Sequence, residues 1–334
     1  MSADHPRVLV TGAGGPSAVS ILLAMEGAPV TMLAADIDPF GAGLYLVPPE
    51  RRSILPRGED PGFADALLEI CRREHVDVVV PTVDTELLPL AMDRARYAEL
   101  GVTLVVASEQ TLRVCLDKWL LAERCREVVR VPATAVLDGA FDAAAWVLPV
   151  IVKPRSGSGS RGIHLLERRE QLDALERDGT LLVQEHLPGV EHSLDVLARS
   201  DGHVSAVVPR ARLKVDSGIA VTGRTLHDDR LDTFARETAR LIGLTTVANV
   251  QVKEDVTGQP ALLEVNARFP GTMPLTVGSG VDMPRLAIGE ALGTAIPDGP
   301  LPFRDIAMVR FFQERFFGVQ ELTDLQRDAG RVPS

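Results

Sequence analysis

The chain has 334 residues, enough for two or three domains with their own hydrophobic cores. Apolar residues make up 46% and charged residues 24%, as in an ordinary soluble globular protein, and a formal net charge of -11 argues against general nucleic-acid binding, which needs a basic face. The three cysteines lack metal-ligand spacing, so we expect reduced thiols in a cytoplasmic protein without a targeting or membrane segment.

The first 107 residues alternate short β-type runs with helical segments. Strands are predicted at residues 7–11, 30–35, 76–80 and 102–107, and helices at residues 17–26, 61–74 and 87–100. This alternation is typical of a doubly wound parallel sheet of the α/β class. We assign residues 1–108 to this first domain.

A glycine-rich turn, Gly12-Ala-Gly-Gly-Pro16, separates the first predicted strand from the first helix. This context suits a dinucleotide site, but Ser17 stands where the fingerprint has its third glycine and Pro16 intrudes. A tight turn between strand and helix is therefore favoured over NAD binding. Asp36 ends the next strand and is interpreted as a solvated strand end rather than a ribose ligand.

A second, smaller unit is expected at residues 109–183. It begins with a predicted helix at residues 109–128, in which Lys118 is either a solvated charge or a phosphate contact. An apolar strand then ends at Lys153, and a loop of small residues follows, with Ser158, Gly159 and Ser160. Such residues let backbone N–H groups approach phosphate oxygens, and Lys153 adds a point charge, so this hairpin is predicted to fold over phosphates.

The remaining residues, 184–334, read as an α+β lobe. Helices are predicted at residues 231–243 and after Pro284, and the polar tail after Phe317 is expected to be partly mobile. A strand leaving the smaller unit is followed by residues that could meet a nucleoside, although loop acids of this kind are ordinary on their own. They are Gln184, Glu185, His186, Leu187 and Glu191.

The most informative segment is a predicted hairpin formed by alternating apolar runs at residues 247–253 and 261–267. If its turn is centred on Thr257-Gly258, Gln251 lies opposite Glu264, and Glu264, Asn266 and Arg268 share one face. A carboxylate and amide oxygens suit Mg²⁺, which proteins usually bind with a few oxygens plus substrate phosphates. Arg268 can hold a phosphate bidentately, so the hairpin predicts a metal–nucleotide site.

Further side chains are candidates for substrate binding. Arg210 and Arg212 lie two apart on a strand-like run, where they could receive a carboxylate or face water. Together with Arg268 and the loop that contains Gly271 and Thr272, they suggest a substrate with at least one carboxylate, as amino acids have. Its expected place is between the hairpin and the first domain, near Thr82 and Glu86.

These motifs, in this order, resemble the ATP-grasp superfamily, in particular single-module proteins similar to half of the carbamoyl-phosphate synthase large subunit. The matching segments run from Val8 to about Gly293: Thr11-Gly-Ala-Gly-Gly, Pro81-Thr-Val-Asp-Thr-Glu86, Asp117-Lys118, Val152-Lys153-Pro, Gln184-Glu185 with Glu191, Asn249-Val-Gln251 and Glu264-Val-Asn-Ala-Arg268. The resemblance implies a Rossmann-like domain followed by a two-lobed ATP-grasp fold, with residues 184–334 as its C-terminal lobe.

The resemblance also implies individual roles. ATP would be bound by Lys118 and Lys153 at its phosphates, by Glu185 and Leu187 at adenine and by Glu191 at ribose. Mg²⁺, or Mn²⁺ in its place, would be held by Gln251, Glu264 and Asn266, and Arg268 would meet the transferred phosphoryl group. The family often has a second acid where Gln251 stands, which weakens a strict two-acid, two-metal arrangement.

The implied activity is that of an ATP-dependent carboxylate–amine ligase. It would activate a carboxylate as an acyl phosphate with Lys153 and Arg268 as catalytic residues, join it to an amine, and release ADP and phosphate. Alternatives are a kinase of carbamate or another small acid, an NAD-linked oxidoreductase, and a non-catalytic ATP-sensing module. Expected partners are small, amino-acid-like carboxylates and amines and a second copy in a homodimer, but neither nucleic acid nor a membrane.

Overall fold

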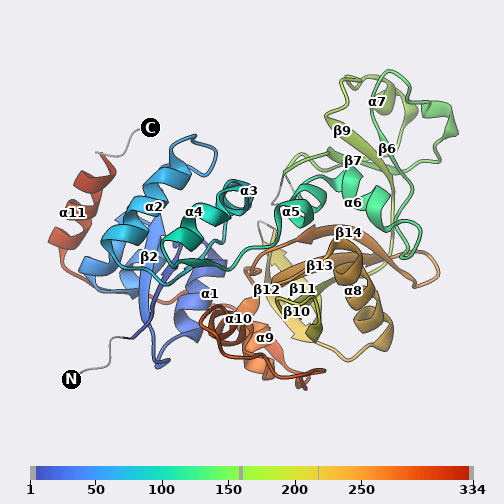
Figure 1. The fold of residues 1–334 in the computed structure, drawn as a ribbon. Coiled ribbons are helices and arrows are strands. Elements are labelled where there is room, and N and C mark those ends of the chain that lie inside the picture. The colour runs from blue at the N-terminus through green and yellow to red at the C-terminus, as the bar shows by residue number, and fades with distance from the viewer. Residues whose placement is uncertain (1–4, 158–160, 217, 331–334) are drawn as a thin grey trace.

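The computed structural model describes residues 5–157, 161–216 and 218–330. Three β-sheets organise these residues, and Figure 1 shows them with their helices. A five-stranded parallel sheet comes first, a four-stranded antiparallel sheet second and a six-stranded antiparallel sheet third. The mixed α/β and α+β fold class predicted from the sequence is confirmed.

The first sheet has the strand order β3-β2-β1-β4-β5, and its strands are β1 (Arg7–Val10), β2 (Thr31–Asp36), β3 (Arg52–Ile54), β4 (Val78–Val80) and β5 (Thr103–Leu104). Its helices are α1 (Pro16–Ala24), α2 (Phe63–Arg73), α3 (Asp84–Met92) and α4 (Arg94–Glu99), with short 3₁₀ turns η1 (Ala42–Leu46) and η2 (Pro49–Arg51). The predicted single helix at residues 87–100 is wrong. Asp93 leaves the helical region, with φ -90° and ψ 6°, and separates α3 from α4.

The second sheet has the order β6-β9-β7-β8, with β6 (Thr134–Val136), β7 (Val150–Pro154), β8 (His164–Leu166) and β9 (Leu181–Glu185). It carries α7 (Arg169–Asp173) and the 3₁₀ turn η3 (Ala143–Ala145), and α5 (Glu109–Cys115) and α6 (Lys118–Cys125) precede it. The predicted continuous helix at residues 109–128 is also wrong. Asp117 breaks it by capping α6, where its carboxylate accepts hydrogen bonds from the N–H groups of Trp119 and Leu120.

The third sheet has the order β14-β13-β10-β11-β12-β15. Its strands are β10 (Glu191–Ala198), β11 (Val204–Asp216), β12 (Ile219–Thr225), β13 (Val247–Glu254), β14 (Pro260–Asn266) and β15 (Ala307–Val309), and its helices are α8 (Asp229–Ile242), α9 (Met273–Ser279) and α10 (Met283–Ala291). Helix α8 confirms the prediction at residues 231–243. Asp228 caps its first turn, and Gly243, at φ +65°, ends it in a left-handed conformation that glycine adopts without strain.

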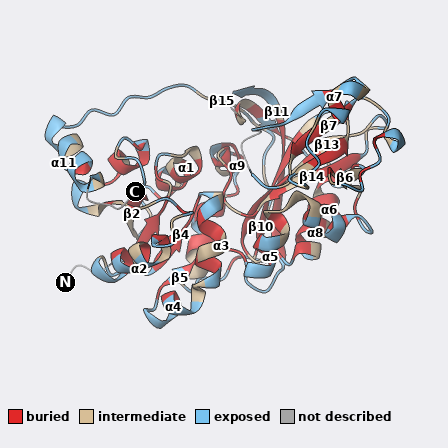
Figure 2. Ribbon diagram, turned by 90° about the horizontal axis from the view of Figure 1, so that it is seen from above, coloured by how far each residue is buried: buried red, intermediate tan, exposed pale blue. Residues whose placement is uncertain are grey.

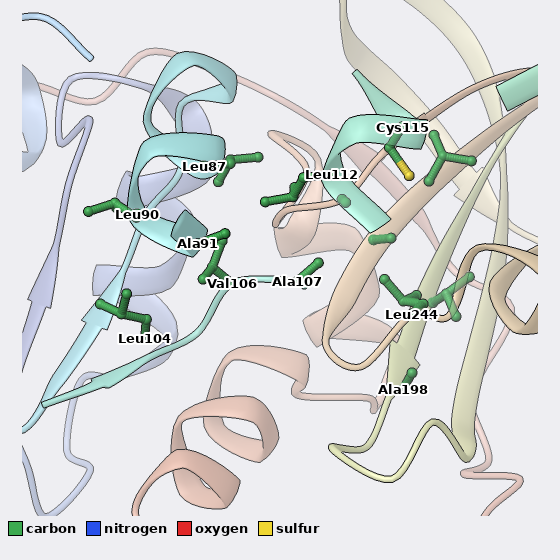
Figure 3. Packing of buried hydrophobic residues seen from close by; sticks show 14 of the residues in the cluster. Leu87, Leu90, Ala91, Leu104, Val106, Ala107, Leu112, Cys115, Ala198 and Leu244 are labelled. Carbon is green, nitrogen blue, oxygen red and sulfur yellow. The ribbon is translucent and has the colours of Figure 1, made fainter. Parts of the chain in front are cut away.

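Two hydrophobic cores join the first and third sheets into one body. Side chains alternate along the buried parallel strands, so Leu9 and Val79 face one core while Val8 and Val80 face the other, and each core continues into the third sheet. Figure 3 shows part of the first core, in which α3, the segment with Val106 and Ala107, and α5 pack beside Leu244. The second sheet has a separate core, whose buried members are Leu137, Phe141, Ala143, Val150, Val152, Leu166, Leu172 and Val183.

The chain returns to the first domain at its C-terminal end. A long exposed connection leaves β15, and α11 (Val319–Ala329) then packs against β3 (Figures 1 and 2). Leu325 is buried there, Arg52 pairs with Glu321 at 2.8 Å, and Phe317 stacks on Tyr45. The tail after Phe317 is polar, as expected, but the sequence did not predict that residues 319–329 form a docked helix, because the surface that receives Leu325 lies far away in the chain.

Among the described residues, no helix has both the length and the apolar character that crossing a bilayer requires.

Candidate active site

The β13–β14 hairpin has the predicted pairing. Gln251 lies opposite Glu264, and the Asn266 side-chain amide donates to the Glu264 carboxylate at 3.2 Å. Among the described residues, no group of three or more His, Cys, Asp and Glu side chains gathers as a metal site. A cation at this hairpin would therefore depend on amide oxygens beside a single carboxylate, a donor set that suits Mg²⁺.

Two lysines approach the Glu264 carboxylate from the neighbouring lobe. The Lys118 ammonium lies 3.8 Å from a Glu264 oxygen and donates to the Gly157 carbonyl at 2.6 Å. Lys153, at the end of β7, is only 5% exposed, and burial lowers its pKa to about 8, with Glu264 opposing that shift and Lys118 adding to it. The two sites that the sequence predicted separately, the hairpin and the lysine-bearing strand, therefore adjoin.

A cavity of about 850 Å³ lies beside the hairpin. Its walls come from β13 and β14, from the carboxyl edge of the first sheet, and from the loop after Arg268. The predicted residues in its lining are Glu86, Arg212, Gln251, Glu264, Asn266, Arg268, Gly271 and Thr272. Within the described part of the chain the lining includes neither Lys118, which lies 3.8 Å from Glu264, nor Lys153, whose pKa the Glu264 charge raises. Ser158, Gly159 and Ser160 lie outside the described residues.

The first domain contributes Glu86, from the start of α3, to this cavity. Its carboxylate is 4% exposed and accepts a hydrogen bond from the Thr11 hydroxyl at 2.5 Å. Burial raises the pKa of Glu86 to about 7, although the Thr11 hydrogen bond acts in the opposite direction. A buried carboxyl group that titrates near neutrality is unusual for a purely structural side chain.

Asp36 differs from its prediction. It is 8% exposed, and its carboxylate accepts hydrogen bonds from the N–H groups of Gly14 at 2.5 Å and Asp38 at 2.8 Å. The interpretation as a solvated strand end is therefore wrong. The reason is that the glycine-rich turn folds back over the end of β2 and needs an acceptor for its backbone, so Asp36 stabilises the tight turn that the sequence favoured at this position.

An ion pair connects the hairpin to the first domain. Arg268, just beyond β14, donates to both oxygens of Asp84, at 2.6 and 2.9 Å. Asp84 is the first residue of α3, two positions before Glu86. Asp84 lies in a matching motif of the sequence, but its partner could not be predicted, because a pairing across 184 positions leaves no local signal.

The two arginines on β11, Arg210 and Arg212, have different environments. Arg210 is 1% exposed and forms a bidentate ion pair with Asp195, at 2.6 and 2.9 Å. Since Asn249 also donates to Asp195, this is an internal network, and the structure contradicts both alternatives considered for Arg210, a substrate carboxylate and water. Arg212 does line the cavity, where it contacts Glu191 and donates to the Gly218 carbonyl at 2.7 Å.

The predicted nucleoside-contacting residues lie where β9 leaves the second sheet. Gln184 is buried and donates to the Thr134 hydroxyl, and the Glu185 carboxylate accepts two hydrogen bonds from Arg130. Leu187 is buried, whereas His186 and Glu191 are partly exposed. Arg130 was not singled out from the sequence.

Comparison with known proteins agrees with this architecture. Residues 8–105 match the model of the PylC-like N-terminal domain, and residues 177–313 match the family described as ATP-grasp in the biosynthetic pathway with Ter operon. The chain therefore contains an ATP-grasp domain. The predicted resemblance to the ATP-grasp superfamily and the predicted two-part fold are thereby confirmed.

Among curated proteins, this chain is 25% identical over 336 aligned residues to the carbamoyl phosphate synthase large chain of Thermomicrobium roseum. The alignment covers 88% of this chain and 30% of the synthase chain. It is 29% identical to the D-alanine–D-alanine ligase of Corynebacterium aurimucosum, over 45% of this chain and 46% of the ligase. The chain thus spans less than a third of the carbamoyl phosphate synthase chain that it matches.

Solved structures show the same fold at lower identity. The N5-carboxyaminoimidazole ribonucleotide synthetase of Thermus thermophilus superposes with a TM-score of 0.71 at 18% identity, covering 92% of this chain and 84% of that one. The L-amino acid ligase of Bacillus licheniformis superposes with a TM-score of 0.66 at 16% identity, covering 87% and 75%. The biotin carboxylase domain of Hydrogenobacter thermophilus 2-oxoglutarate carboxylase, solved with MgADP and bicarbonate, gives 0.72 at 18% identity, covering 90% and 72%.

Proposed function

We propose that this protein is an ATP-dependent carboxylate–amine ligase. It activates a substrate carboxylate with ATP as an acyl phosphate and then forms an amide or peptide bond, releasing ADP and phosphate. The observation that carries the proposal is that Glu264 has two lysines as neighbours and also lines a cavity whose walls include Arg268 and Glu86. The Glu264 carboxylate therefore adjoins both the proposed phosphate site and the cavity for a second reactant.

The lysines are assigned to the phosphates of ATP. Holding an ammonium group at Lys153 in a buried place is unfavourable without an anion, as its lowered pKa indicates, and a triphosphate supplies that anion. Glu185 and Leu187 are assigned to adenine, with the neighbouring Gln184 and His186, and Glu191 is assigned to ribose. Residues 158–160 complete the phosphate loop in this proposal.

The chemistry of the hairpin fits Mg²⁺. Gln251, Glu264 and Asn266 would hold it through one carboxylate and two amide oxygens, leaving room for phosphate oxygens, and Mn²⁺ would be accepted by the same set. When bound, the ion neutralises charge on the phosphates. The MgADP in the Hydrogenobacter carboxylase domain supports the same pairing of metal and nucleotide in this fold.

Transfer of the γ-phosphoryl group needs alignment and positive charge rather than covalent help from the protein. Arg268 is assigned to the transferred group, with Lys153 as the second catalytic cation. Arg212 and the loop residues Gly271 and Thr272 would then hold the substrate carboxylate in the cavity. We place the substrate among amino acids or their analogues, because the cavity offers arginines and acids on opposing elements.

Closure of the second lobe would exclude water from the acyl phosphate. Its separate hydrophobic core supports such a hinged movement relative to the body formed by the other two sheets. We accordingly propose three domains: residues 1–108, a lid at 109–183 and the C-terminal lobe at 184–334. A cytoplasmic homodimer completes the proposal, and sedimentation equilibrium tests its oligomeric state.

A coupled assay for ADP release over pairs of carboxylates and amines, with mass detection of the product, tests the function. Glu264→Ala and Lys153→Ala should abolish amine-dependent ADP release, since the loss of one transition-state contact costs about 3–4 kcal/mol. The exposed Lys214 on β11 provides a matched control, and Lys214→Ala should turn over normally. Near-normal turnover in both site variants, with their folds intact by circular dichroism, would refute the proposal.

A second candidate is a kinase of carbamate or another small acid. The similarity to carbamoyl phosphate synthase over 88% of this chain favours it. ADP release with bicarbonate or a carboxylate alone, unchanged by any amine, would select this candidate over the ligase. Tight MgATP binding without turnover on every pair would indicate an ATP-sensing module instead.

A further inference from the structure

Glu86 occupies a position in the cavity that binding of ATP leaves unexplained. It belongs to the first domain and lines a cavity that is large enough for a small molecule and whose lining includes neither of the two lysines. The Thr11 hydroxyl donates a hydrogen bond to this carboxylate at 2.5 Å. Backbone hydrogen bonds from Val83 and Thr82 also lower its pKa, yet burial outweighs these donors and raises the pKa to about 7.

The charges around Glu86 leave it without a cation of its own. Asp36, at the end of β2, adds negative potential. Arg268, which lines the same cavity, already donates to both oxygens of Asp84. The segment with Arg57 and Glu59 packs on the backbone of Glu86 through Gly58, and both side chains are exposed and line the same cavity. Glu86 is therefore a buried acid in a negative setting that faces a cavity.

The position of Glu86 relative to Arg268 decides what it could act on. Asp84 joins Arg268 to the first turn of α3, and Glu86 follows in that same turn. A carboxylate activated near Arg268 would therefore lie in the cavity that Glu86 also lines, whereas Lys118 and Lys153 are not part of that lining. A second reactant would approach through this cavity.

We propose that Glu86 accepts the proton from the ammonium group of the incoming amine and that the acyl acceptor enters from the first-domain side of the cavity. This inference rests on the proposed ligase function. It assigns a cationic amine to the second subsite, because acids outnumber the one arginine, Arg57, on the first-domain wall, and such a wall attracts an ammonium group and repels a carboxylate.

The Glu86 carboxylate takes one proton from the ammonium group, which becomes a neutral amine with a free electron pair. That pair forms the C–N bond to the acyl carbon, and the C–O bond to phosphate breaks as phosphate leaves with its electrons. A second N–H proton goes to the departing phosphate, and Glu86 returns its proton to solvent. A base is most effective when its pKa lies near the working pH.

The test compares two nucleophiles on the same acyl phosphate. The twenty protein amino acids, mixed, supply both carboxylate and ammonium nucleophile, and dipeptides are measured by mass. Hydroxylamine, which is largely unprotonated at neutral pH and needs no base, traps the acyl phosphate as a hydroxamate. Glu86→Gln should lower dipeptide formation by about 10²–10⁴-fold and leave hydroxamate formation within about twofold. Glu99→Gln, an exposed change on α4, should alter neither.

The pH profile provides a readout that a merely structural role would not move. Dipeptide formation should rise with pH through about 7, where Glu86 loses its proton, and hydroxamate formation should not. Thr11→Val keeps the Glu86 carboxylate but removes a hydrogen bond that lowers its pKa, so the rise should move to higher pH. This variant stays informative if Glu86→Gln fails to fold.

The outcomes separate the two proposals. If Glu86→Gln forms both hydroxamate and dipeptides at the rates of the unmodified protein, the role of Glu86 is overturned and the ligase proposal stands. The same holds if the pH profile of dipeptide formation does not move in Thr11→Val. Equal loss of hydroxamate and dipeptide in Glu86→Gln also overturns this role, because the acid would then act before the amine arrives. If the unmodified protein forms neither product, the ligase proposal falls, and the role of Glu86 falls with it.

Discussion

The buried charge of Lys153 lowers the stability of the fold, and in the proposed function the same charge strengthens the binding of ATP. Its pKa falls from an ordinary 10.5 to about 8 in the folded protein, which means that the fold disfavours the charged form by about 3 kcal/mol. Below pH 8 both the folded and the unfolded protein carry the proton, so the whole destabilisation is present at pH 7. It fades as pH rises from 8 to 10.5, because the folded state is then already neutral.

Lys153→Met keeps the aliphatic stem and removes the charge. We expect the variant without nucleotide to gain up to about 3 kcal/mol in free energy of unfolding at pH 7, and the gain to shrink towards zero by pH 10.5. Urea unfolding followed by tryptophan fluorescence reports on the right region, because the two tryptophans are Trp119 on α6 and Trp146 beside the core of the second sheet. Lys214→Met, at an exposed position, is the control.

The same variant should bind MgATP less tightly. Loss of a hydrogen bond to a charged group costs about 1.5–3 kcal/mol, or roughly 10- to 100-fold in the dissociation constant. Calorimetry measures this loss, and the stabilisation by MgATP seen in unfolding should decrease in parallel. A variant that is less stable at pH 7 and binds MgATP as the unmodified protein does would refute the reasoning from burial and charge.

Three further changes test the scaffold. Arg210→Met should lower the free energy of unfolding by about 3–5 kcal/mol, because it leaves the Asp195 carboxylate buried without its cation. Urea titration measures this change, and a loss below about 1 kcal/mol would contradict the structural role of Arg210. Gly43→Ala should cost about 1–3 kcal/mol, since its Cβ would collide with the Ala13 carbonyl of the glycine-rich turn, and an unchanged melting temperature would argue against that close contact. Leu325→Asp should release α11 from the first domain, seen as faster hydrogen exchange at residues 319–329 with MgATP binding retained; unchanged protection would show that burial of this side chain does not hold the helix.

Local patterns in the sequence were enough to predict the β13–β14 hairpin. Alternation with a period of two and a short turn leave one register that buries the apolar face, so the pairing of Gln251 with Glu264 follows from residues close in the chain. The same reasoning failed at Asp93 and Asp117, where a polar residue ends or caps a helix inside a helical pattern. Helix boundaries depend on single capping side chains, which periodicity averages away.

What the sequence determined by itself was therefore the superfamily, the alternating layout of the first domain and the donor types on the hairpin, because each depends on neighbours within a few residues. Only the tertiary structure decided that Arg210 is an internal ion pair, that α11 docks on β3 and that Arg268 meets Asp84. These contacts join segments far apart in the chain. Their burial and pKa values depend on how much water the assembled fold excludes, a quantity that no single segment contains.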